Sequence, residues 1–165
     1  MGALQRSMQV YKRQLAQGDL QTAYRGLMAF MRELRGHFQK EYARFTISSL
    51  YYGFMDMTYF ALTTKELARR KLKVAVVFVH EEFRFEVWLS GANRDVQGRL
   101  WRVLREEGWQ GSRLAQDPRR EDFVAARVLV AEPDFNDLDA LRAGLVKGVL
   151  AFCEEAEEKL VGLEG

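Results

Sequence analysis

Seven polar and aromatic side chains in the middle of the chain are the residues whose types could do chemistry. They combine carboxylates, a histidine, an arginine, a hydroxyl and an indole, which offer proton transfer, anion pairing and a stacking surface. These candidate ligand-binding residues are Asp56, Thr58, His80, Glu82, Arg84, Glu86 and Trp88. Because Arg84, Glu86 and Trp88 are two residues apart on one expected strand, their side chains should share a face of a sheet.

We expect this polar face to be the one that helices leave uncovered. Asp56 and Thr58, on a neighbouring expected strand, are predicted to line the same face. An Arg, a Trp and two carboxylates would then form a small polar pocket. The competing interpretation is an antiparallel sheet with one solvated face, which is common.

A second hypothesis makes the protein a small hydrolase or nuclease-like enzyme that uses carboxylates and His80. His80 and Glu81 begin a zinc-protease pattern, but Arg84 stands where the second histidine belongs. Trp88 follows Glu86 where a restriction-nuclease pattern has lysine. We therefore name no catalytic residue, expect no metal and no cofactor, and favour a non-enzymatic module that binds a small ligand or a protein partner.

Composition predicts one globular domain over residues 1–165, because 48% of the residues are hydrophobic and 29% are charged. The single cysteine, Cys153, excludes an internal disulfide and fits a reducing compartment, so a cytoplasmic location is expected. The N-terminal residues show no apolar leader. The most apolar run, 74–79, is far shorter than the roughly 20 residues of a membrane span, so no membrane association is expected.

Charge is distributed unevenly along the chain. Residues 1–73 hold 13 basic and 5 acidic side chains, whereas residues 74–165 hold 12 and 18. The halves should neutralise each other within the fold or across a homodimer. Nucleic-acid binding is not expected, because the whole domain lacks the strongly basic balance of such proteins and the basic segment 65–73 is predicted to be solvated.

Hydrophobic periodicity predicts an α+β domain in the order ααβαββαβα. The expected helices are 4–16, 20–44, a short one that starts at Thr63, 93–107 and 138–161; the expected strands are 54–62, 73–79, 83–90 and 123–131. Strands 73–79 and 83–90 should form a hairpin through the turn at His80. We expect a mostly antiparallel four-stranded sheet with the long helices packed on one face.

Three segments carry a family resemblance: YGFMDMTYF at 52–60, FVHEEFRFEVWL at 78–89 and PDFNDLD at 133–139. They resemble a family of small single-domain prokaryotic proteins of unknown function, which implies a free-standing domain and assigns no catalytic residues. Residues from Arg84 through the last expected helix are also similar to a small uncharacterised domain attached to nuclease-like proteins. This second likeness bears on the fold rather than on function.

Overall fold

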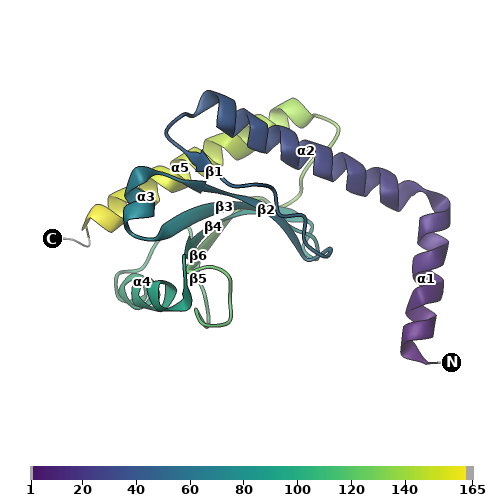
Figure 1. Cartoon of the computed structure of the whole chain (residues 1–165), viewed down its shortest axis with the longest axis horizontal. Helices are drawn as coiled ribbons and strands as arrows, with labels where there is room; N and C mark the ends of the chain where they lie inside the picture. The colour runs from purple at the N-terminus through teal and green to yellow at the C-terminus, as the bar shows by residue number, and fades with distance from the viewer. Residues whose placement is uncertain (1, 163–165) are drawn as a thin grey trace.

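The computed structural model describes residues 2–162 as an α+β domain built on one antiparallel sheet (Figure 1). In chain order the elements are α1 (Ala3–Gln17), α2 (Asp19–Glu41), β1 (Thr46–Ile47), β2 (Met57–Thr63), α3 (Lys65–Arg69), β3 (Leu72–Val79), β4 (Arg84–Gly91), α4 (Arg94–Glu107), β5 (Arg113–Leu114), β6 (Ala125–Val130) and α5 (Leu138–Gly162). The α+β class and the antiparallel sheet are confirmed.

The sheet has six strands where the sequence predicts four, so the expected order ααβαββαβα is incomplete. The strands lie in the order β1-β2-β3-β4-β6-β5, and every neighbouring pair is antiparallel. The two missed strands, β1 and β5, have two residues each and form the edges. Two residues are too few to show the alternation of apolar and polar side chains that predicts a strand.

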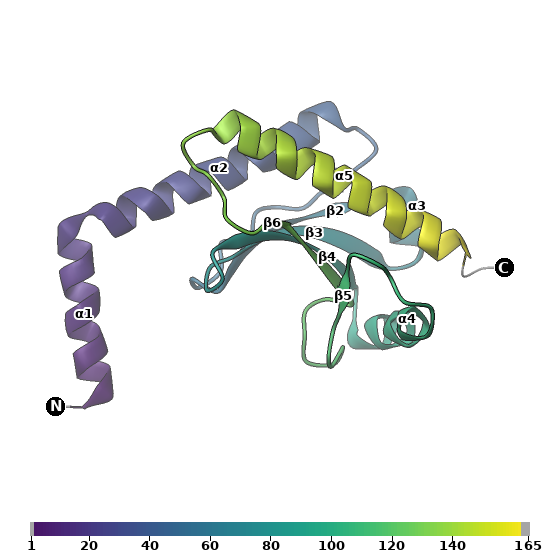
Figure 2. The same ribbon diagram turned by 180° about the vertical axis from the view of Figure 1, so that it is seen from behind.

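Helices α2 and α5 lie together over one face of the sheet, as expected for the long helices (Figures 1 and 2). Phe30 and Phe38 of α2 and Phe152 of α5 are buried. The Phe30 ring meets Phe85 of β4 edge-on at 5.8 Å, and the Phe38 ring lies 6.1 Å from Phe60 of β2. The opposite face has no long helix across it, and α4 borders it at one end.

Local backbone geometry moves several boundaries from their expected places. Gly53 and Met55 have φ values of 74° and 64°, in the left-handed region, so residues 53–56 turn and β2 starts at Met57 rather than at position 54. Phe83, with φ 51°, closes the hairpin turn, and β4 starts one residue later. The α3 cap is Thr64 rather than Thr63, because the Thr64 side chain accepts the Leu67 amide at 3.1 Å.

Helix α1 projects from the rest of the molecule and meets α2 at a corner (Figure 1). Gly18, with φ 83°, makes the corner, and its amide donates to the Leu15 carbonyl. The expected helix is confirmed, yet none of its side chains is buried: Leu4 is 77% exposed and Tyr11 is 49% exposed. Across residues 2–162, no helix is both long and apolar enough to cross a bilayer.

Candidate functional site

A buried carboxylate marks the face of the sheet that α2 and α5 leave uncovered. Glu86 has a side chain only 1% exposed, and both of its oxygens accept hydrogen bonds. Arg84 Nε donates to Oε1 at 2.8 Å, and Trp88 Nε1 donates to Oε2 at 2.6 Å. Arg113 donates to both oxygens, at 3.2 and 3.0 Å. The expectation that Arg84, Glu86 and Trp88 share a face is therefore met.

The hydrogen bonds keep Glu86 ionised despite its burial. Burial by itself raises the pKa of a carboxyl group, but the bonds from Arg113, Trp88 and Arg84 outweigh it and hold the pKa of Glu86 below its ordinary value. With its oxygens occupied by two guanidinium groups and an indole, this carboxylate serves to position its neighbours. It is not available to take a proton from a substrate.

Sequence reasoning missed Arg113, because it stands on the two-residue strand β5. Its guanidinium carbon lies 5.0 Å from the centre of the Phe123 ring, and that ring lies 5.1 Å from the Trp88 ring. The nitrogens of Arg113 thus bind Glu86, while its guanidinium group lies over the Phe123 ring. The face of an aromatic ring attracts such a cation. A two-residue strand has no local signal, so only the pairing of β5 with β6 reveals this residue.

A pocket of about 520 Å³ lies on the same face, between the sheet and the N-terminal end of α4. Its lining includes Tyr59, Lys73, Trp88, Arg94 and Asp122. The volume falls within the range of about 300–1,000 Å³ that small-ligand sites occupy. Trp88 connects the pocket with the Glu86 cluster, because it is one of the lining residues of the pocket and its indole nitrogen donates to Glu86.

Two charged side chains of the pocket are already paired, and one is not. Arg94 Nη2 lies 3.4 Å from Asp122 Oδ1. The side chain of Lys73, a half-buried residue of β3, has no hydrogen-bond or ion-pair partner among residues 2–162. The pKa of Tyr59 is raised, first by burial and further by nearby Tyr51 and Asp122. Its phenol therefore stays neutral at physiological pH, and Lys73 supplies the unbalanced positive charge.

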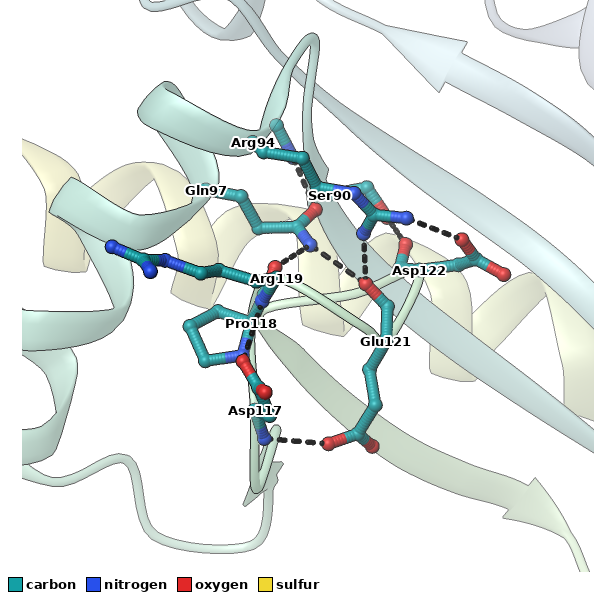
Figure 3. A network of polar contacts seen from close by, with 9 residues as sticks. Ser90, Arg94, Gln97, Asp117, Pro118, Arg119, Glu121 and Asp122 are labelled. Atoms are coloured by element: carbon teal, nitrogen blue, oxygen red, sulfur yellow. Dashed lines mark hydrogen bonds and ion pairs between the residues drawn. The ribbon is translucent and has the colours of Figure 1, made fainter.

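The rim of the pocket is fixed by a polar network around Gln97 (Figure 3). The buried Gln97 side chain donates to the Pro118 and Glu121 carbonyls, both at 2.8 Å. Ser90 Oγ donates to the Asp122 carbonyl at 2.6 Å. These bonds tie the long loop before β6 to the start of α4 and to the end of β4, so the pocket wall that carries Asp122 is preformed.

Thr58 lies on the opposite face from the one expected. It pairs with Phe78 of β3 and is fully buried beneath the helices, on the same side as Phe60. Its hydroxyl donates to the Tyr52 carbonyl at 2.7 Å and lies 2.9 Å from His80 Nε2. Since the single hydroxyl proton goes to Tyr52, His80 Nε2 must be the donor to Thr58.

His80 consequently supports the turn through its contact with Thr58. Burial lowers the pKa of His80, which keeps the ring neutral, and its Nε2 proton is used by Thr58. Asp56 is exposed, and the pKa of its carboxyl group is lowered by hydrogen bonds from the Phe54 and Met57 amides. Glu82 is exposed in the hairpin turn.

Of the seven predicted site residues, the structure thus brings three together at the open face. Thr58 and His80 form a separate pair under the helices, while Asp56 and Glu82 lie in loops. Among residues 2–162, no group of three or more His, Cys, Asp or Glu side chains could hold a metal ion. Of the carboxylates that the enzyme hypothesis requires, Asp56 acts electrostatically on His80, whereas Glu86 is held by Arg84, Trp88 and Arg113 on the opposite face of the sheet.

These features define a single α+β domain with one covered and one open sheet face, the latter holding a buried charge cluster beside a pocket. The chain belongs to a family whose model is described as Domain of unknown function (DUF7000) and matches residues 4–160. A family of unknown function that covers most of the chain is what the sequence resemblance implied. No curated protein and no solved structure matches the chain.

Proposed function

We propose that the protein is a binding module whose pocket holds a small ligand with a flat ring and one anionic group. The observation that carries this proposal is the position of Lys73. Its side chain is unpaired, and the residue is half-buried and lines a pocket whose walls include Trp88 and Tyr59. An anion would pair with Lys73 while a ring lies against the aromatic side chains.

The size and rigidity of the pocket support this reading. At about 520 Å³ it accommodates a molecule of the size of a nucleoside monophosphate. The Gln97 network holds the Asp122 wall in place before a ligand arrives, which reduces the entropy lost on binding. Glu86 contributes indirectly, because it fixes the Trp88 indole through the 2.6 Å hydrogen bond.

Several finer expectations remain part of this proposal. The source is taken to be prokaryotic, the location cytoplasmic and the action non-enzymatic. A nucleic acid is not the proposed ligand, because Glu66 binds both Arg69 and Arg70 within the basic segment 65–73 and so offsets part of its charge.

The binding of AMP tests the proposal. Two comparison ligands are used: adenosine, which has the ring but no phosphate, and inorganic phosphate, which has the anion but no ring. Calorimetry should show AMP binding more tightly than either part. Lys73→Met should weaken that binding by roughly tenfold or more, since a charge-assisted contact is lost. The matched control, Lys65→Met on α3, removes an exposed charge outside the pocket and should leave the affinity unchanged.

Other outcomes count against the site or the function. Equal losses in the two lysine variants would mean that the protein attracts anions through its overall charge. If neither AMP nor a library of aromatic carboxylates and phosphates binds or raises the melting temperature, the small-ligand function is wrong.

A further inference from the structure

The helix α1 is amphipathic but covers nothing in its own chain. Leu4, Met8, Tyr11 and Leu15 recur at helical spacing and form one apolar stripe. Met8 is 50% exposed, and no side chain of the helix is buried. An isolated helix of about 15 residues is marginally stable in water, so this stripe is suited to packing against another surface.

The charge of α1 is also one-sided. The helix contains Arg6, Lys12 and Arg13 and no acidic residue. Lys12 is four residues from Met8 and therefore borders the apolar stripe. A surface that complements α1 must combine exposed apolar side chains with carboxylates.

Such a surface occurs at one end of the sheet, which we call the acidic end and define as loops 52–56, 80–83 and 131–137. The loops lie together: the His80 amide donates to the Asp56 carbonyl, and the Phe83 ring is 6.1 Å from the Phe135 ring. They contain no Lys or Arg. Their carboxylates are Asp56, Glu81, Glu82, Glu132, Asp134 and Asp137, all on exposed residues.

The acidic end also presents large apolar side chains to solvent. Phe54 is 89% exposed, Phe83 is 57% exposed and Met55 is 54% exposed. Met55 and Phe83 adopt the left-handed backbone conformation, which is costly for residues with side chains. The turns therefore hold these side chains outward at the expense of backbone strain, beside six carboxylates.

We propose that α1 of one copy of this chain docks on the acidic end of a second copy, and reciprocally, to form a twofold homodimer. Basic and apolar groups on the helix then meet acidic and apolar groups on the loops. In an isologous pair each chain supplies one helix and one acidic end, so the apolar stripe of α1 and the acidic end are covered in both copies.

Docking within one chain is disfavoured by the corner at Gly18. The Gly18 amide and the Gln21 side chain both donate to the Leu15 carbonyl, at 3.2 and 2.8 Å. On the other side, the Thr22 amide and hydroxyl both donate to the Gly18 carbonyl. These bonds fix the corner, and both views show α1 standing apart from its own sheet (Figures 1 and 2).

Sedimentation of the whole chain over a wide concentration range gives the first test. The protein should form a dimer that weakens as salt rises, because exposed charges are screened. The double variant Met8→Glu and Tyr11→Glu should raise the dimer dissociation constant by roughly tenfold or more. The double control Gln5→Glu and Gln9→Glu places the same two charges off the stripe and should have a much smaller effect. A monomeric wild type at all concentrations overturns the proposal.

Cross-linking decides which surfaces meet. Met8→Cys and Phe54→Cys are made as separate proteins, mixed and treated with a short bismaleimide; the native Cys153 is buried and gives little background. The expected product joins one variant to the other. Predominant Met8→Cys homodimers would mean that helices pair with each other. A cross-link within one chain carrying both changes at high dilution would place α1 on its own sheet.

A membrane is the remaining alternative partner for a basic amphipathic helix. Binding of the monomer to vesicles of anionic phospholipid, lost in the Met8→Glu and Tyr11→Glu variant while no dimer is seen, would overturn the proposal. The α1 variants should not lower the melting temperature of the monomer, because α1 buries no side chain.

Discussion

At the scale of single residues, Glu86 is the most consequential position on the open face. It is an ionised group with almost no contact with water, held by Arg84, Arg113 and Trp88. A buried ion pair is weak evidence for net stability, yet the loss of one partner is expensive because the other charges are left uncompensated. The role of this carboxylate can therefore be measured through folding, independently of any ligand.

Glu86→Gln is predicted to lower the free energy of unfolding by about 3 kcal/mol, at the lower end of the usual range because both arginines retain some access to water. Urea unfolding at neutral pH measures it. The control Glu106→Gln removes an exposed carboxylate of α4 and should change stability by less than about 0.5 kcal/mol. A Glu86→Gln variant as stable as the control would show that the cluster is effectively solvated.

The difference in stability between wild type and Glu86→Gln should depend on pH. The folded-state pKa of Glu86 lies below its unfolded-state value, which is about 4.3 for a free glutamate. The ionised form of Glu86 therefore stabilises the protein fully at pH values above the unfolded-state pKa. This contribution is lost as the pH falls through the folded-state pKa. The stability difference between wild type and Glu86→Gln should be constant near neutrality and shrink in acid. A difference that grows in acid would contradict the assignment.

At the scale of elements, two glycines differ in whether their position tolerates a side chain. Gly26, within α2, has nothing within 4 Å of the place a Cβ would take. Gly53 has φ 74°, and a Cβ there would lie 2.0 Å from the Met57 carbonyl oxygen. The first glycine is only a weak point in a helix, whereas the second is required by the turn that exposes Phe54.

We predict that Gly26→Ala raises the free energy of unfolding by about 0.5–1 kcal/mol, because alanine loses less backbone entropy in a helix. Gly53→Ala should lower it by at least ~2 kcal/mol through strain and steric overlap. Thermal melts of both variants beside wild type give the comparison. Equal effects of the two substitutions would mean that the turn at residues 53–56 relaxes freely.

The elements also show what the sequence could and could not predict. Long helices and the central strands follow from apolar periodicity, and both are observed. The face of Thr58 was predictable as well: it is two residues from Phe60, so both belong on the covered side, and the error was to group it with Glu86. By contrast, Arg113 reaches Glu86 only through the pairing of β5 with β6, which depends on contacts distant in sequence.

At the scale of the whole molecule, Cys153 reports on the integrity of the core. It is fully buried on α5, and burial raises the pKa of its thiol to about 12. The reactive thiolate is therefore scarce, and reagents cannot reach it in the folded state. We predict that Cys153 is alkylated only in globally unfolded molecules. The rate of alkylation should therefore follow the rate of unfolding or the fraction of unfolded protein.

Labelling in increasing urea provides the measurement, with Glu106→Cys as an exposed thiol on α4 that should react at once under native conditions. Protection of Cys153 should disappear together with the far-UV circular dichroism signal. Rapid labelling in the absence of denaturant would show that α5 opens separately from the sheet.

The placement of α2 and α5 has a consequence for how the chain acquires its structure. The two helices that cover the sheet begin and end the packed part of the chain, from Asp19 to Gly162, with all six strands between them. Phe30 packs against Phe135, and Thr64 donates to Glu157 across 93 positions. Closing such distant contacts is slow, and strands without their cover expose apolar surface. A nascent chain should therefore stay open and prone to aggregation until α5 has been synthesised, so that folding is completed only after translation has passed that helix.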